Sequence, residues 1–232
     1  MREAFHQDLD RITDQLVEMT RLTGSAISRA TTALLDADVT LAESVIAADE
    51  QIDRIREDLD EQALLLLARQ QPVATDLRIV VTAMHMASDL ERMGDLARHV
   101  AKVARLRYPD SAVPPELRST IVEMDQVATL IVSKTGSIIA AKDVAEAESL
   151  ARDDDAMDAL HVHVFEMLLR EDWPHSTATA VDITLLARYF ERFADHAVAV
   201  AQRVVFLVTG EWQWRDAAEA RLSSQGGGAP IP

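Results

Sequence analysis

Acidic residues spaced four apart are the part of this sequence with the clearest capacity for chemistry. Residues at that spacing lie on one face of an α-helix, so each pair would present two carboxylates side by side. Four of the pairs at this spacing stand at matching places in the two halves: Asp49/Asp53 and Glu91/Asp95 in the first, and Asp154/Asp158 and Glu191/Asp195 in the second.

Hydrophobic periodicity places these carboxylates on helix faces that we expect to be buried. At 100° per residue, the face of Glu91 and Asp95 also carries mainly apolar side chains, and the same holds for the other pairs. Desolvating a carboxylate is costly unless it is protonated, paired with Arg or Lys, or bound to a cation. The neighbours are Ile46, Ala63 and Leu67 for Asp49/Asp53, and Leu77, Val80 and Met84 for Glu91/Asp95. They are Leu150, Phe165 and Leu168 for Asp154/Asp158, and Ala180, Thr184, Ala187 and Val198 for Glu191/Asp195.

Two acidic pairs brought together from two helices in each half match the hard oxygen ligands that Mg²⁺, Mn²⁺, Ca²⁺ or iron prefers. The pattern therefore predicts one metal-binding cluster per half. His99 could extend the first cluster and His161 the second.

The alternative is a set of structural ion pairs or a solvated acidic stripe. It is strongest in the first half, where Arg98, Lys102 and Arg56 lie near the acidic faces. In the second half the corresponding positions hold uncharged side chains or histidine, and only Arg188 lies close to Glu191. Val198 and Gln202 replace Arg98 and Lys102, and His161 replaces Arg56.

Long helices must position these residues. Apolar residues at three- and four-residue steps predict helices over about 3–36, 39–69, 75–107 and 176–209, with two more carried by Leu117–Ile138 and Leu150–Leu168. Helices of this length with short connections are typical of an antiparallel bundle. The segment 108–115, which contains three of the seven prolines, predicts the boundary between two halves.

An internal repeat organises the chain. Ala87–Ala101 aligns without a gap with Ala187–Ala201, and the Asp-x-x-Ile-Asp stretch at 49–53 resembles that at 154–158, with Met for Ile. We therefore predict an all-α fold of two tandem three-helix bundles. The predicted divisions are 1–108 for the first repeat, 109–115 for a proline-containing linker, 116–210 for the second repeat and 211–232 for a flexible tail.

Composition excludes several functions. The chain has 232 residues, and 23 Lys and Arg against 39 Asp and Glu give a net charge of −16, which argues against binding to nucleic acid or anionic lipid. There is no cysteine, and apolar runs are too short to span a bilayer. Phosphate-binding loops, nucleophile elbows and the His-Glu-x-x-His motif are missing as well, so we expect no enzymatic activity.

The doubled motif resembles the PhoU family. Its two copies, Glu91-Arg92-Met93-Gly94-Asp95 and Glu191-Arg192-Phe193-Ala194-Asp195, each follow an Asp-x-x-[Ile/Met]-Asp helix, and the stretch 72–87 is also similar to PhoU proteins. The resemblance covers about residues 3–210.

The resemblance implies a cytoplasmic negative regulator of phosphate uptake and of phosphate-starvation signalling. Such a protein bridges the ATPase subunit of the phosphate ABC transporter and a sensor histidine kinase. It would form a homodimer and associate with the inner face of the membrane only through these partners, with no membrane insertion of its own and no nucleic acid bound.

The resemblance also implies metal ions, such as Fe, Mg, Mn or Zn, on the acidic faces. Four residues after each motif Asp, family members often have Asn or Asp, whereas this chain has His99 and Ala199, which predicts reduced ligand sets. The implied ligands are Asp49, Asp53, Glu91 and Asp95 in one half and Asp154, Asp158, Glu191 and Asp195 in the other.

A carboxylate-rich metalloprotein of di-iron or iron-storage type is the alternative function. Ferritin-like sites use Glu-x-x-His from core helices, and here that motif occurs only at Glu3–His6. A structural bundle whose acids are only ion-paired is the third possibility.

Overall fold

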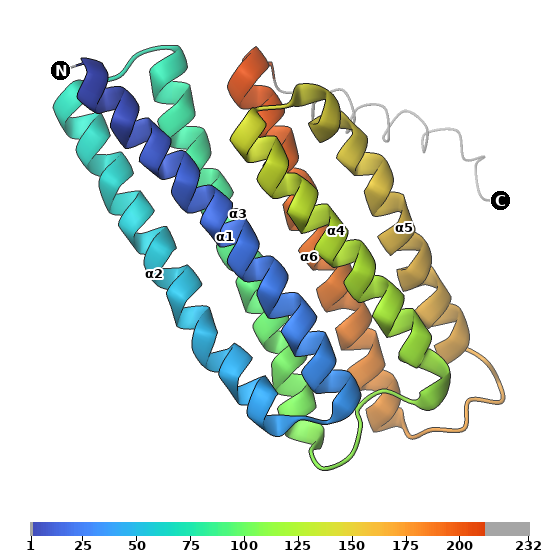
Figure 1. The fold of residues 1–232 in the computed structure, drawn as a ribbon. Helices are drawn as coiled ribbons and strands as arrows, with labels where there is room; N and C mark the ends of the chain where they lie inside the picture. The colour runs from blue at the N-terminus through green and yellow to red at the C-terminus, as the bar shows by residue number, and fades with distance from the viewer. Residues whose placement is uncertain (1, 212–232) are drawn as a thin grey trace, which may run out of the picture.

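The computed structural model describes residues 2–211, with side chains from residue 5 onward, and within this range it contains helices but no strand. Six long α-helices and one short 3₁₀ turn follow one another along the chain (Figure 1). Their bounds are α1 (Arg2–Asp36), α2 (Val39–Gln70), α3 (Thr75–Arg107), η1 (Pro115–Leu117), α4 (Arg118–Ala141), α5 (Val144–Leu168) and α6 (Thr177–Thr209).

Local sequence signals explain where the helices begin and end. Asp38, Asp143 and Ser176 are N-caps whose side chains accept hydrogen bonds from the backbone N–H three residues later, at 2.9, 3.0 and 3.1 Å. α2 ends just before Pro72, which cannot continue a helix. The observed bounds lie close to those that the periodicity predicts.

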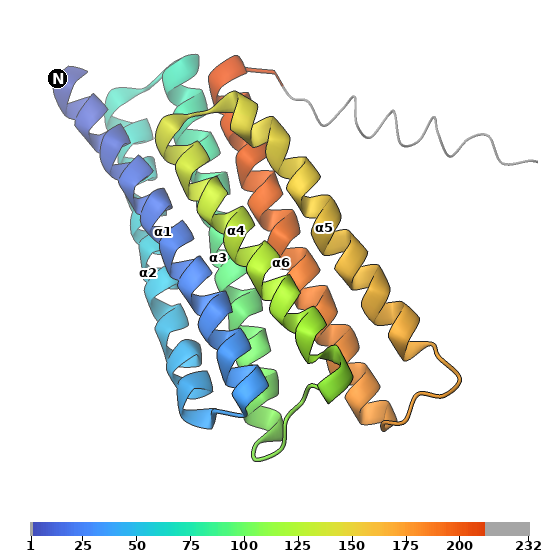
Figure 2. The same ribbon diagram turned by 45° about the vertical axis from the view of Figure 1, so that its right-hand side comes forward.

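The six helices form two antiparallel three-helix units, α1–α3 and α4–α6, that lie side by side (Figures 1 and 2). α1 packs against α4 and α3 against α6, whereas α2 and α5 are the outermost helices of the two units. This arrangement confirms the predicted all-α fold of tandem bundles.

The seam between the units combines close apolar packing with ion pairs. A Cβ on Gly136 of α4 would lie 2.7 Å from Thr20 Oγ1 of α1, so the two helices approach too closely there for a larger residue. Between α3 and α6, Asp89 accepts from Arg203 Nε at 2.6 Å and lies 3.1 Å from His196 Nδ1. Arg107 forms an ion pair with Asp182.

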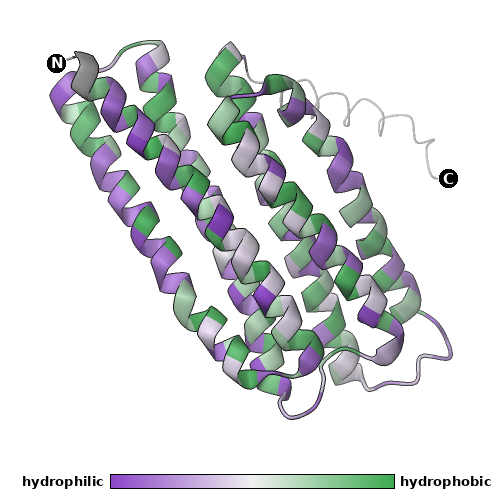
Figure 3. Ribbon diagram, viewed as in Figure 1, coloured by the Kyte–Doolittle hydropathy of each residue, from purple (hydrophilic) through white to green (hydrophobic). Residues whose placement is uncertain are grey.

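Hydrophilic residues recur along α2 and α5 in Figure 3. None of the helices that the structure describes is long and apolar enough to cross a membrane. The tail predicted at 211–232 lies outside the described residues except for Glu211.

Candidate acidic clusters

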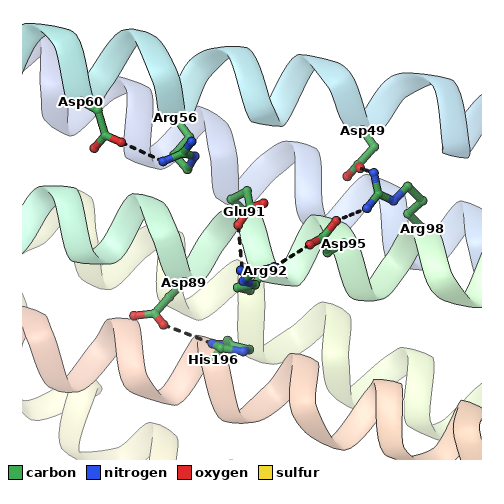
Figure 4. Close-up of polar contacts among 9 residues, drawn as sticks. All are labelled: Asp49, Arg56, Asp60, Asp89, Glu91, Arg92, Asp95, Arg98 and His196. Carbon is green, nitrogen blue, oxygen red and sulfur yellow. Dashed lines mark hydrogen bonds and ion pairs between the residues drawn. The ribbon is translucent and has the colours of Figure 1, made fainter.

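The first acidic cluster lies between α2 and α3, and an arginine occupies it (Figure 4). Arg98 of α3 places Nη1 2.7 Å from Oδ2 of Asp49 on α2 and also pairs with Asp95 Oδ1. The contact with Asp49 is an ion pair rather than an aligned hydrogen bond, since Oδ2 has no hydrogen-bond partner. One guanidinium therefore joins carboxylates from two helices.

Asp49 is deeply buried because its neighbour on α3 is a glycine. The Asp49 side chain is only 4% exposed. A Cβ at Gly94 would lie 3.0 Å from Asp49 Oδ1 and 2.9 Å from Ile52 Cδ1. The missing side chain thus allows α2 to approach α3 closely at the cluster.

Burial weakens the acids of the first cluster. It raises the pKa of Asp49 to about 6, against the opposing influence of the Arg98 charge. Burial and the neighbouring Asp95 likewise raise the pKa of Glu91. The arginine thus offsets only part of the cost of burying these carboxyls.

The other basic residues near this cluster point elsewhere or lie at its rim. Arg56 pairs with Asp60 at 2.8 Å, not with Asp49 or Asp53. Arg92 lies 3.0 Å from Asp95 Oδ2 at the exposed edge.

His99, which could have extended the cluster, stacks on Tyr189 of α6 with ring centroids 5.3 Å apart. Leu77, expected on the buried face, is 41% exposed because it lies in the first turn of α3, at the end of the bundle.

The second acidic cluster lies between α5 and α6 and has far less basic compensation. Arg188 pairs with Glu191. Glu191 Oε2 is buried and accepts no hydrogen bond from any described residue. Within the described residues, no ion pair is formed by the other three carboxylates, Asp154, Asp158 and Asp195.

Asp154 is the most perturbed acid in this cluster. Burial raises its pKa to about 7, and the negative charges of Asp158, Asp195 and Glu191 act in the same direction. Burial and Asp195 also raise the pKa of Glu191. The carboxylates of Asp158, Asp195 and Glu191 thus lie close enough to Asp154 to oppose its ionisation.

The expectation that all the acidic faces are buried is wrong for part of this cluster. Asp158 and Asp195 are exposed, and Phe165 is 38% exposed. α5 packs on α4 and α6 at the edge of the molecule, so positions at the border of these contacts stay open to solvent. His161 lies near Glu191, and its buried Nε2 has no hydrogen-bond partner among the described residues.

The two clusters differ in how well they fit a metal ion. Across residues 2–211, no group of three or more acidic or imidazole side chains is arranged so that it could hold one. In the first cluster, Arg98 already supplies the positive charge. In the second, a buried carboxylate oxygen and three acids that have no partner within residues 5–211 offer the hard oxygen donors that such an ion takes. The eight ligands remain a prediction.

The sequence did not single out the ion pairs at the seam between repeats. Burial would raise the pKa of Asp89, but hydrogen bonds from His196 and Arg203 hold it below its ordinary value. These residues are far apart in the sequence, and only their positions on facing sides of two long helices would have suggested the pairing.

Comparison with known proteins extends the likeness to the whole bundle. The family model described as PhoU domain matches twice, over residues 16–104 and 121–204. The curated PhoU homolog 2 of Mycobacterium tuberculosis, a phosphate-specific transport system accessory protein, is 47% identical over 210 residues, which cover 90% of this chain and 99% of that protein. PhoU homolog 1 of Mycobacterium leprae is 45% identical, with 91% and 96% covered.

Solved structures agree with this likeness. The crystal structure of PhoU from Pseudomonas aeruginosa superposes with a TM-score of 0.82 at 29% identity, covering 89% of this chain and all of that one. The phosphate transport system regulatory protein PhoU from Streptococcus pneumoniae gives 0.81 at 25% identity, with 90% and 98% covered.

Fold and sites together define a class of protein: an all-α tandem-repeat bundle with an acidic cluster between the second and third helix of each repeat. The domain model matches each repeat separately, and close relatives are similar over nearly their full length. The chain belongs to the PhoU family and has a role in phosphate transport, which confirms the resemblance of its doubled motif.

Proposed function

We propose that this chain is a negative regulator of phosphate uptake and of phosphate-starvation signalling. It acts as an adaptor between the ATPase subunit of a phosphate ABC transporter and a sensor histidine kinase at the inner face of the membrane. The observation that carries the proposal is the double match to the PhoU domain, together with relatives named as accessory proteins of phosphate transport.

An adaptor of this kind works through differential binding. If it binds one state of the transporter more tightly than the other, it shifts the population toward that state. The size of the shift depends only on the ratio of the two affinities. The net charge of −16 favours docking on basic partner surfaces.

The second acidic cluster supports metal binding as part of this function. Asp154, Asp158, Glu191 and Asp195 would hold the ion, and a bound cation would neutralise charge and link α5 to α6. Without it, burial and the neighbouring negative charges raise the pKa of Asp154 to about 7 and that of Glu191 above its ordinary value.

Phosphate uptake in cells tests the regulatory role. In a strain lacking every PhoU-family gene, we expect uptake of radiolabelled phosphate and expression of starvation genes to stay high in phosphate-rich medium. Returning this chain should repress both. A chain that is produced at normal levels yet represses neither would contradict the proposal.

A further inference from the structure

We infer that Arg98 takes the place of a cation in the first cluster, so that this cluster does not bind metal ions and the two repeats are functionally unequal. The inference builds on the proposed metal binding of the second cluster, but it concerns the first. It assigns to Arg98 the role of a built-in counterion that decides which repeat can bind metal.

The position of Arg98 supports this role. Its guanidinium contacts Asp49 on α2 and Asp95 on α3, and thus links the two helices as a bridging ion would. The arginine fork presents several fixed N–H donors and stays charged at every relevant pH. The Arg98 side chain is only 28% exposed, so its charge lies largely out of solvent between the two helices.

Three of the four carboxylates of the first cluster lie within ion-pair distance of an arginine, and only Asp53 makes no ion pair among the described residues. Asp95 pairs with Arg98 through Oδ1 and with Arg92 through Oδ2. Arg92 also lies 3.7 Å from Glu91 Oε2. Gly94 brings α2 close to α3, which leaves Asp49 buried between the two helices with the guanidinium against it.

The repeat provides a natural comparison. Val198 stands where the first repeat has Arg98, because the two motifs align at an offset of 100. Arg192, the counterpart of Arg92, makes no ion pair with any described residue. Among the described residues, the second cluster therefore keeps its carboxylates without a bridging guanidinium, and the replacement of Arg98 by Val198 accounts for the missing bridge.

Exchanging these two side chains tests the inference. The probe is Mn²⁺, counted by the electron paramagnetic resonance signal of the free ion during titration of the purified full-length chain. We expect one bound ion per wild-type chain, two for Arg98→Val and none for Val198→Arg. The double exchange should bind one ion, now in the first repeat.

Two neutralised ligands identify the site. Asp195→Asn should abolish binding to the wild-type chain, and Asp95→Asn should leave it unchanged. The matched control is Arg54→Val, which also removes an arginine from an ion pair, but on the exposed face of α2. It should keep the wild-type count.

A stability measurement accompanies the count. In EDTA, Arg98→Val should melt roughly 5 °C below wild type, because it leaves Asp49 buried without its counterion, and Mn²⁺ should restore the loss. Arg98→Met, which keeps an unbranched apolar stem, replaces Arg98→Val if that variant does not fold.

The outcomes separate the two proposals. Two ions in the wild-type chain, or no gain in Arg98→Val and Arg98→Met, would overturn the role of Arg98. A wild-type chain that binds none while the Arg98 variants bind one would refute metal binding in the second repeat and uphold the counterion in the first.

Discussion

At the scale of single residues, burial has the largest influence on the acidity of the clustered carboxyls. It is the first cause of the raised pKa at Asp49, Glu91, Asp154 and Glu191 alike. Of these four carboxyls, only Asp49 forms a short ion pair with an arginine on another helix, and this arginine lowers its pKa. Asp154 has no such neighbour, so it is the residue at which charge costs most stability.

Asp154→Asn should therefore stabilise the metal-free protein at high pH. The folded pKa of Asp154, about 7, lies above its ordinary value of 3.8, so the ionised form destabilises the fold above pH 7. That penalty shrinks as the pH falls from 7 toward 4 and disappears only well below pH 3.8, where Asp154 is protonated in both the folded and the unfolded state. We expect a gain of about 1–2 kcal/mol at pH 8, discounted for partial solvent access, and only a small fraction of that gain at pH 4.

Denaturant unfolding in EDTA at the two pH values measures this difference. The neighbouring exposed Asp155→Asn serves as the control for the change in net charge. Equal stability of wild type and Asp154→Asn at pH 8 would show that the Asp154 carboxylate is well solvated or paired after all.

At the scale of elements, a single glycine sets the depth of the first cluster. Gly94 lets α2 approach α3, whereas its counterpart in the second repeat is Ala194, which is fully buried. The burial of the corresponding acids differs in the same way: Asp49 is buried, whereas Asp154 is only half-buried.

Gly94→Ala should destabilise the protein by roughly 1 kcal/mol. The new Cβ would clash with Ile52 and Asp49, and this cost exceeds the gain of about 1 kcal/mol in helix propensity. Ser88→Ala, on the exposed side of α3, controls for propensity alone. If thermal unfolding shows Gly94→Ala to be more stable than wild type, the close packing of α2 on α3 does not hold.

The elements were predictable from the sequence, and their contacts only in part. Periodicity, caps and Pro72 locate the helices, because these signals are local. Which carboxylates come together was also predictable from the repeat. The exposure of Leu77, Asp158 and Asp195 was not, because it depends on small rotations of packed helices and on where each helix ends.

Partner choice among charged side chains was the least predictable feature. Arg98 and Arg56 both lay near acidic faces in the sequence, yet Arg98 bridges the first cluster and Arg56 pairs with Asp60. Long side chains can reach several partners from one backbone position, so spacing alone does not decide between them.

At the scale of the whole molecule, the two units are similar in fold but unequal in charge distribution. The first repeat compensates its clustered carboxylates with its own arginine, whereas three of the four acids in the second cluster form no ion pair with any described residue. We expect the α5–α6 face to be the one through which metal and charge affect partner binding. Regulation would then depend on one repeat more than on the other.

Direct binding to the transporter ATPase subunit tests this central claim. The subunit is immobilised, and its affinity is measured for wild type, for Glu191→Ala/Asp195→Ala, and for Glu57→Ala/Glu61→Ala. The last variant removes two charges at the same spacing from exposed positions on α2. We predict saturable wild-type binding that weakens about tenfold in the cluster variant and changes little in the control. No wild-type binding, or equal affinities for the two double variants, would contradict it.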